Sequence, residues 1–246
     1  MRSNIRKFLS HSPIFAFNQI LRDRWVAAQA ASLPEGSRVL DVGAGSCPYR
    51  TLFAHCDYRT QDFTSLQDDQ LRYGGYGRID YVCDAAAIPV EDGSFDAVIC
   101  TEVLEHVPEP IPVVHELGRV LRPGGRLILT APLGSGIHQE PYHFYGGYTP
   151  YWYQRFLDEA GFTDIKVESN GGFYRHYGQE SLRFVVMTRP LAPGIPAWLT
   201  VAGAPLWLIL APILGLLLPA LGALLDRFDV ERRFTIGYHI TASKGE

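Results

Sequence analysis

The chain has 246 residues, of which 47% are hydrophobic and 20% are charged, and its formal net charge at pH 7 is −4. This composition excludes a disordered chain, and the acidic balance excludes the whole-protein positive field that grips a nucleic-acid backbone, so no nucleic-acid partner is expected. The four cysteines follow no metal-binding or redox spacing, and we expect reduced thiols in a cytoplasmic protein.

The N-terminal segment, residues 1–31, combines basic residues with apolar residues at roughly helical spacing. This pattern predicts an amphipathic helix. Two placements are open at this point: the helix packs on the domain, or it lies on a membrane surface.

Residues 38–126 alternate short apolar runs with longer mixed segments, which predicts a parallel sheet wrapped by helices. Continuous apolar runs predict strands covered on both faces, at 38–42, 95–101 and 125–131. Shorter strands are predicted at 58–61 and 80–83, helices at 112–121 and 151–160, and further strands at 162–168 and 234–241.

Residues 195–225 contain no charged residue and are interrupted by four prolines and three glycines. If strand 234–241 joins the same sheet as strand 38–42, both ends of this segment lie on one side of any membrane. One crossing is then excluded, and two crossings need about 40 apolar residues. We therefore expect short helical pieces that form a re-entrant or interfacial hairpin, with Trp198 and Trp207 at the interface. The alternatives are a homodimer interface or an extra buried layer.

A glycine-rich turn follows the first predicted strand: the chain reads Asp41-Val42-Gly43-Ala44-Gly45. Glycines at such a turn let a charged ligand approach bare backbone. Pro48 stands where the dinucleotide-binding fingerprint has its third glycine, so that fingerprint is not met.

Two later aspartates extend this candidate site. Asp62 follows the second predicted strand, where a carboxylate can accept hydrogen bonds from both hydroxyls of a ribose. Asp84 ends the third, and with Ala85 it is in a position to meet the edge of an adenine.

Five motifs, in this order, resemble those of the class I methyltransferases that use S-adenosylmethionine (SAM). They span about residues 37–167 and lie at 39–45, 94–98, 103–107, 121–125 and 159–162. The resemblance implies a Rossmann-like, doubly wound, mostly parallel α/β sheet with an antiparallel last strand, which residues 234–241 would form. It also implies that SAM binds with Asp41, Gly43, Ala44 and Gly45 near its methionine part, Asp62 at its ribose, and Asp84 and Ala85 at its adenine.

The segment after the fourth predicted strand carries the candidate catalytic residues. His106 is the first candidate for a general base, with Glu105 and His143 as further candidates. The pattern of Glu102, Glu105 and His106 also resembles that of metal-dependent O-methyltransferases, which implies a divalent cation such as Mg²⁺, completed by His138 or His143. The alternative is that these residues serve strand-end structure and bind no metal.

Seven aromatic residues within 141–153 form either a lid over the methyl-transfer site or part of the core. Related proteins often carry an Asp and an Arg in this stretch, and this chain has neither, so the resemblance names no acceptor.

The expected organisation is an N-terminal helix at 1–31, a SAM-binding core at 32–194, a hydrophobic helical insertion at 195–225 and a final strand within 226–246. The expected function is O-methylation of a hydrophobic, lipid-linked or small-molecule acceptor, at the inner face of the cytoplasmic membrane. The alternatives are a membrane-associated SAM-binding scaffold without catalysis and a soluble dimeric small-molecule methyltransferase.

Overall fold

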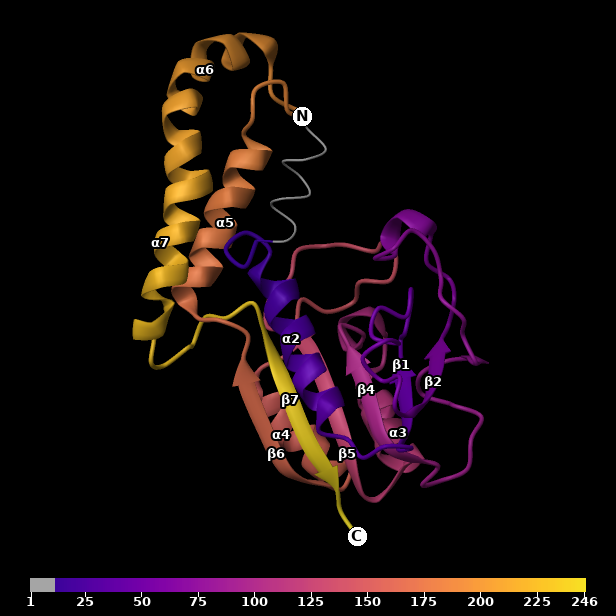
Figure 1. The fold of residues 1–246 in the computed structure, drawn as a ribbon. Coiled ribbons are helices and arrows are strands. Elements are labelled where there is room, and N and C mark those ends of the chain that lie inside the picture. Colours follow the sequence, from indigo (N-terminus) through magenta and orange to yellow (C-terminus); the bar gives the residue numbers. More distant parts are fainter. Residues whose placement is uncertain (1–11) are drawn as a thin grey trace. The chain divides into compact units, whose positions relative to one another are not determined.

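The computed structural model describes residues 12–246 and contains one seven-stranded sheet. The strand order across the sheet is β3-β2-β1-β4-β5-β7-β6 (Figure 1). The strands are β1 (Arg38–Val42), β2 (Asp57–Asp62), β3 (Tyr81–Val82), β4 (Phe95–Thr101), β5 (Leu121–Pro132), β6 (Phe162–Ser169) and β7 (Gly237–Lys244).

The first five strands pair in parallel, and β7 pairs antiparallel with β5. This confirms the predicted fold class, including the antiparallel last strand. The register places Val39 of β1 opposite Ala97 of β4 and Tyr58 of β2. All three predicted continuous runs form strands, and β3 is reduced to two residues.

Helices cover both faces of the sheet because successive strand residues point to opposite sides. These helices are α2 (Phe17–Ala31), α3 (Pro110–Val120) and α4 (Pro150–Glu159). On one face α2 packs through Val26 and Ala30 on Val39, Ile99 and Ile128. On the other face α3 and α4 pack through Val113 and Leu157 in a cluster with Leu40, Val98 and Leu129. The N-terminal helix predicted within 1–31 thus begins at Phe17, and residues 1–11 lie outside the described part of the chain.

The chain divides into two compact units, at boundaries that differ from the expected ones. Residues 22–168 and 237–246 form the sheet unit, and of the described residues 12–21 and 169–236 form the second unit. The difference arises because α5 (Phe173–Met187), which the sequence pattern did not reveal, packs along α7 (Leu218–Leu225) and so belongs to the second unit (Figure 1).

The apolar segment is one continuous helix of 32 residues, Ala197–Phe228. It consists of α6 (Ala197–Pro212), a π-helical turn η3 (Ile213–Leu217), α7 and a 3-10 turn η4 (Asp226–Phe228). The expectation of short pieces broken at prolines is therefore wrong. Pro196 caps the helix and Pro219 lies in the first turn of α7, whereas Pro205 and Pro212 lie inside α6, and a π-turn follows Pro212 directly.

Candidate active site

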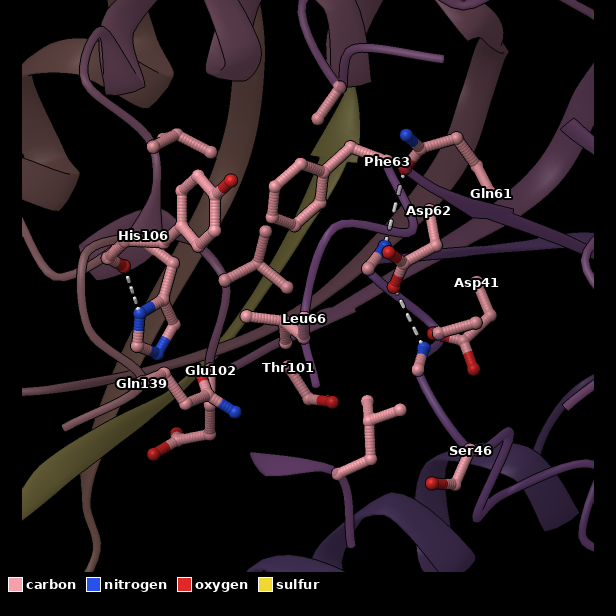
Figure 2. Close-up of a pocket in the computed structure, with 18 of the residues that line it drawn as sticks. Asp41, Ser46, Gln61, Asp62, Phe63, Leu66, Thr101, Glu102, His106 and Gln139 are labelled. Carbon is pink, nitrogen blue, oxygen red and sulfur yellow. Dashed lines mark hydrogen bonds between the residues drawn. The ribbon is translucent and has the colours of Figure 1, made fainter. Parts of the chain in front are cut away.

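The site lies at the carboxyl ends of β1, β2 and β4, where two short 3-10 turns also occur, η1 (Asp68–Gln70) and η2 (Leu104–His106). A cavity of about 370 Å³ opens there. All seven residues expected to contact SAM line this cavity: Asp41, Gly43, Ala44, Gly45, Asp62, Asp84 and Ala85. Glu102, His106, Tyr142 and Phe144 line it as well (Figure 2).

The glycine turn depends on the absence of a side chain at Gly43. Its φ is +69°, and a Cβ built there would lie 2.3 Å from Cγ2 of Val103. Any larger residue must therefore displace Val103 and adopt an unfavourable backbone conformation. This close approach brings the turn after β1 against the segment that follows β4.

Asp62 fixes the glycine turn from the end of β2. Its Oδ2 accepts a hydrogen bond of 2.9 Å from the amide of Gly45, and its Oδ1 accepts one of 2.8 Å from the amide of Thr64 (Figure 2). Burial raises the pKa of this carboxyl, and the backbone amides oppose the rise. A carboxylate has about four acceptor positions, so two are left for a ligand.

Gln61 is a site residue that the sequence analysis missed. It is buried, its Oε1 accepts from the amide of Gly43 at 3.3 Å, and its amide nitrogen donates to the carbonyl of Cys83 at 2.6 Å. One side chain thus ties the glycine turn to the strand that leads to Asp84. A glutamine directly before Asp62 carried no recognisable signal, because its role depends on the strand pairing.

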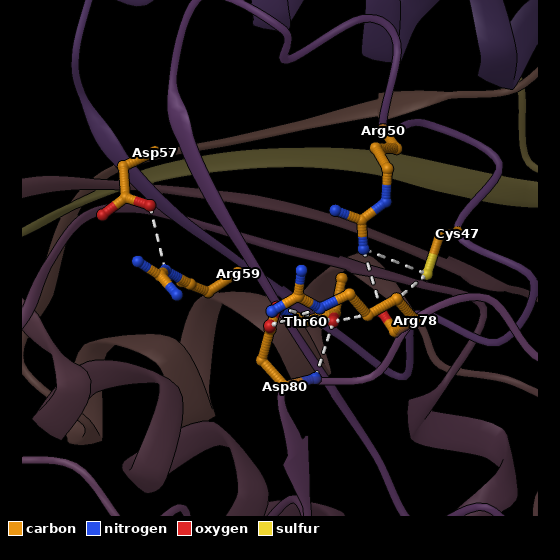
Figure 3. Close-up of polar contacts among 7 residues, drawn as sticks. All are labelled: Cys47, Arg50, Asp57, Arg59, Thr60, Arg78 and Asp80. Carbon is orange, nitrogen blue, oxygen red and sulfur yellow. Dashed lines mark hydrogen bonds and ion pairs between the residues drawn. The ribbon is translucent and has the colours of Figure 1, made fainter.

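The turn after Gly45 is held by a polar network at the edge of the sheet (Figure 3). The carbonyl of Arg78 accepts from Arg50 Nη2 at 2.9 Å and from Thr60 Oγ1 at 2.8 Å. Asp80 accepts from the amide of Thr60 at 3.1 Å. These bonds fix the loop before β3 against the residues that follow the glycine turn.

Asp41 is almost fully buried, and its carboxyl accepts a hydrogen bond from the hydroxyl of Tyr58. Burial raises the pKa of Asp41 to about 7. Asp84 is exposed instead, and its Oδ1 accepts from the amide of Ala86 at 2.8 Å. The two aspartates at strand ends therefore differ in environment.

Glu102 does not join the expected metal-ligand triad. Its carboxylate forms a 2.9 Å ion pair with Arg22 of α2, and it accepts a hydrogen bond of 2.8 Å from Thr130 Oγ1. Arg22 also lines the cavity, and its Nε is buried without a hydrogen-bond partner among the described residues. The sequence analysis missed Arg22, which it treated only as one basic residue of an amphipathic helix.

Three histidines come together where the sequence placed the catalytic residues. The ring centroids of His106 and His138 are 4.8 Å apart, and those of His138 and His143 are 4.6 Å apart. Glu105, His106 and His138 offer ligand atoms that all lie within 4.8 Å of one another. The structure thus groups Glu105 and His106 with His138, one of the two histidines expected to complete such a site, and Glu102 lies outside this group.

The environment of His106 assigns its tautomer. Its Nδ1 lies 2.6 Å from the carbonyl oxygen of Tyr142. Because a carbonyl oxygen only accepts, Nδ1 carries the proton and Nε2 keeps its lone pair. Burial, with smaller effects from His138 and His143, lowers the pKa of His106 to about 4, so the ring is neutral at pH 7.

Glu105 is buried beside this ring. Neither of its carboxyl oxygens has a hydrogen bond within the described chain, and Oε1 lies 3.7 Å from Nε2 of His106. Burial, followed by the nearby carboxylate of Glu102, raises the pKa of Glu105 well above its ordinary value.

The aromatic stretch divides between the two expected roles. Tyr142 and Phe144 line the cavity. Tyr148 and Tyr153 belong to the core, and the hydroxyl of Tyr148 donates to the carbonyl of Leu104 at 2.6 Å. Tyr151 is exposed. Only the first part of the stretch therefore covers the cavity.

The sequence matches a family of known proteins at this site. Residues 40–129 match the model of the methyltransferase domain family. This is a class I SAM-dependent methyltransferase domain. The methyltransferase domain thus includes β1 to β4 and most of β5, and with them the glycine turn, Asp62 and His106.

Curated relatives of the methyltransferase domain include quinone-pathway enzymes. A ubiquinone biosynthesis O-methyltransferase of Xanthomonas campestris pv. campestris (strain B100) is 37% identical over 131 residues, which are 48% of this chain and 51% of the relative. A demethylmenaquinone methyltransferase of Bacillus velezensis is 25% identical over 198 residues, which are 65% of this chain and 85% of the relative. The chain thus spans about half the length of the first of these.

A solved structure shares the fold of the methyltransferase domain. It is phosphoethanolamine N-methyltransferase 2 of Haemonchus contortus in complex with SAM, with a TM-score of 0.54 and 18% identity. The match covers 98% of this chain and 60% of that chain. At this identity the likeness shows the fold alone.

Proposed function

We propose that this protein transfers a methyl group from SAM to an oxygen atom of a hydrophobic small-molecule or lipid-linked acceptor. The observation that carries the proposal is the cavity itself. The glycine turn and Asp62 lie on one side of it, and His106 with a free Nε2 lies on another (Figure 2). The relatives quoted above are named as methyltransferases, which gives no support to a scaffold without catalysis.

The residues of the cavity fit SAM. The turn of Gly43, Ala44 and Gly45 lines the cavity and carries no side chain larger than a methyl group, so the methionine part can approach its backbone. The two acceptor positions left on Asp62 suit the ribose hydroxyls, and Asp84 with Ala85 borders the space for adenine. The H. contortus protein with this fold holds SAM.

The chain's own residues then position the acceptor and receive its proton. Bound SAM supplies a methyl group that is already activated for in-line displacement, so positioning accounts for most of the acceleration. His106 accepts the acceptor's hydroxyl proton at Nε2, while Nδ1 keeps its own proton, donates it in a hydrogen bond to the carbonyl of Tyr142 and so orients the ring. Glu105 and His143 border this ring, and Tyr142 and Phe144 exclude water from it.

Replacing His106 tests this assignment. With His106→Ala we expect kcat to fall by about 10² to 10⁴-fold, while the Kd for SAM, measured by calorimetry, stays unchanged. Turnover is followed with labelled SAM and extracts of the cell's own membranes. His115→Ala, an exposed histidine of α3, is the control and should retain activity. Equal turnover in the two variants contradicts a catalytic role for His106.

The types of ligand atom near His106 test the expectation of a divalent cation such as Mg²⁺. Glu105, His106 and His138 offer one carboxylate and two imidazoles, whereas Mg²⁺ prefers oxygen ligands and imidazoles suit Zn²⁺. The residues therefore do not fit Mg²⁺, and the proposed proton transfer to His106 needs no metal. Metal analysis of protein purified without chelator, and turnover after chelator treatment, decide the point. Loss of turnover that added metal restores contradicts the metal-free proposal.

The location of the protein forms the second part of the proposal. We place it in the cytoplasm, at the inner face of the cytoplasmic membrane. The helix Ala197–Phe228 is long and apolar enough to cross a membrane, and little of it is buried. Cell fractionation tests this placement: the full chain should remain with membranes after a high-salt wash, and its recovery in the soluble fraction without detergent contradicts it.

A further inference from the structure

The two halves of the long apolar helix differ in how they are packed. In α7 Pro219 and Gly222 are buried, and a Cβ at Gly178 of α5 would lie 2.9 Å from Cα of Pro219. In α6 no residue is buried, and Trp198, Val201 and Leu208 are each about two-thirds exposed or more. α7 is therefore a packed part of the second unit, whereas α6 meets α5 only along one side, where Trp207 Nε1 donates to the carbonyl of Val185 at 3.4 Å.

The exposed surface of α6 is too wide for contact with a second protein chain. The less exposed positions recur at helical spacing and form one stripe, namely Thr200, Ala204, Trp207, Leu210 and Ala211. Large exposed apolar residues occupy well over half of the remaining circumference, namely Trp198, Leu199, Val201, Leu206, Leu208 and Ile209. A helix–helix seam covers only an apolar stripe of about 100° or more, and a helix that is apolar on all sides is typical of a lipid environment.

The topology of the sheet excludes a crossing of the membrane by this helix. β6 and β7 are neighbours in one sheet, so the chain leaves the sheet and returns to it on the same side. An even number of crossings is then required. α5 has only 15 residues and carries the ion pair Glu180–Arg183, with N and O 3.2 Å apart on exposed side chains. Because α5 cannot serve as a second span, α6 must enter and end within one leaflet.

The length of α6 matches the depth of one leaflet. Its 16 residues rise about 24 Å, and one leaflet with its headgroups is about 20–22 Å thick. The hydroxyl of Ser181 donates to the carbonyl of Leu214 at 2.8 Å, which places Glu180 and Arg183 level with the end of α6. The charged pair thus marks the position where headgroups would lie.

Only one charged residue, Arg189, lies in the chain between Arg183 and Asp226. It belongs to the loop between α5 and α6, and its guanidinium donates to the carbonyl of Val186 at 2.7 Å. Arginine can keep its aliphatic stem in an apolar layer while its charge points to the headgroups. The remainder of the loop, with exposed Leu191, is apolar enough to enter first.

We propose that α6 and the loop at residues 188–196 insert tip first into a single leaflet of a lipid bilayer, while α7 and the part of α5 up to Arg183 stay at the level of the headgroups. This inference rests on the membrane location proposed above and does not depend on methyl transfer. It makes α6 the membrane element and α7 its support. Trp198 then lies deep in the leaflet, and Trp207 lies about 13 Å closer to the surface.

Flotation with vesicles tests the insertion. The probe is the full chain with vesicles of phosphatidylethanolamine and phosphatidylglycerol. Leu208→Glu places a charge on the exposed face of α6, and we expect the bound fraction to fall about 50-fold. Val230→Glu makes the same kind of change at a position that is 89% exposed beyond the helix, and it should bind like the wild type. Equal binding of the two variants, or no binding of the wild type, overturns the proposal.

Two further measurements separate this proposal from its alternatives. Leu191→Cys should not react with an impermeant maleimide trapped inside the vesicles, and labelling from inside shows a crossing and overturns it. Light scattering without detergent should not give a monodisperse dimer, since a dimer would show that α6 is an interface between copies. The Kd for SAM is measured on each variant: unchanged values with lost flotation support the proposal, and failure of SAM binding in the wild type instead contradicts the proposed function.

Discussion

The sheet unit and the second unit each depart from the usual burial of residues: the sheet unit buries charged side chains, and the second unit exposes apolar ones. In the sheet unit, Asp41, Asp62 and Glu105 are buried carboxylates next to strands whose apolar side chains are fully buried. In the second unit, α6 exposes large apolar side chains and no charged residue. Buried carboxylates and exposed apolar surface each cost stability unless a ligand or partner compensates. The role proposed for each unit rests on the residues that depart from ordinary burial.

The largest effect is expected in the sheet unit, at Gly43. Gly43→Ala creates the 2.3 Å approach to Val103 and strains a φ of +69°, so we expect the Kd for SAM, measured by calorimetry, to rise by about 100-fold or more. The double variant with Val103→Ala should recover part of the affinity, which shows that the fold is intact.

Gly36→Ala is the matched control for Gly43→Ala. Gly36 has a φ of +75°, and nothing lies within 4 Å of its added Cβ. We expect a loss of stability of about 1 kcal/mol from backbone strain and no change in the Kd for SAM. If Gly43→Ala behaves like this control, the glycine turn is not the donor site.

The second effect is expected in the second unit, at Gly178. Gly178→Val places methyl groups against the backbone of Pro219 and should destabilise the α5–α7 pair by about 1–3 kcal/mol. Amide hydrogen exchange in residues 173–187 measures this, and the Kd for SAM should not change. Gly203→Val of α6 has nothing within 4 Å and should leave that exchange unaltered. Equal exchange in both variants means that α7 is not packed as described.

A third, pH-dependent effect distinguishes the buried carboxyl of Asp41 from a surface one. The pKa of Asp41 is raised to about 7, chiefly by burial, so the folded state holds a proton that the unfolded state has already lost. Its contribution to stability is fully present below about pH 4 and is lost as the pH rises through 7. Compared with Asp41→Asn, the wild type should lose about 1–3 kcal/mol between pH 5 and pH 7.5.

Asp96 is the control for that experiment, because its pKa is shifted in the opposite direction from that of Asp41. The amide of Arg38, and then the Arg122 side chain, lower the pKa of Asp96. Its stabilising contribution is therefore present above its unfolded pKa and is lost as the pH falls through its folded pKa. Asp96→Asn keeps Asp41, so urea unfolding of this variant over the same pH range should show the same loss toward pH 7.5 as the wild type. Identical slopes for the two variants contradict the assignment at Asp41.

The smallest effect is expected at Arg155, which forms an exposed 3.0 Å ion pair with Glu159 on α4. Exposed pairs at this spacing contribute about 0.3–0.5 kcal/mol. Arg155→Ala should change the free energy of unfolding by no more than this amount and should leave vesicle binding unchanged. A larger loss means that this pair, unlike those of the site, has a structural role that its exposure does not indicate.

Much of the fold could be predicted because the strands of the sheet are continuous apolar runs. β1 and β4 have the predicted bounds, since both faces of each are buried. α5 could not be predicted, because its residues mix charged and apolar types and its packing partner, α7, lies some 40 residues further along the chain. The prolines led to a wrong prediction because the helix continues past Pro205 and Pro212, which lie inside α6.

In the site, too, features set by neighbouring residues could be predicted, and contacts between distant segments could not. The glycine turn and Asp62 follow strand ends that the sequence marks, so their positions at the cavity could be predicted. The pairing of Glu102 with Arg22 and of Asp41 with Tyr58 joins segments far apart in the chain. Such pairs depend on strand order and helix placement, which single-sequence patterns do not determine.

The position of β7 between β5 and β6 also has a consequence for biosynthesis. The ribosome completes both neighbours, and then the whole apolar helix, before it makes β7. Until then β5 and β6 each expose an unpaired edge, and unpaired edges promote aggregation. A nascent chain thus presents its most hydrophobic segment while its sheet is incomplete, and early capture of α6 by lipid would shield that segment while the last strand closes the sheet.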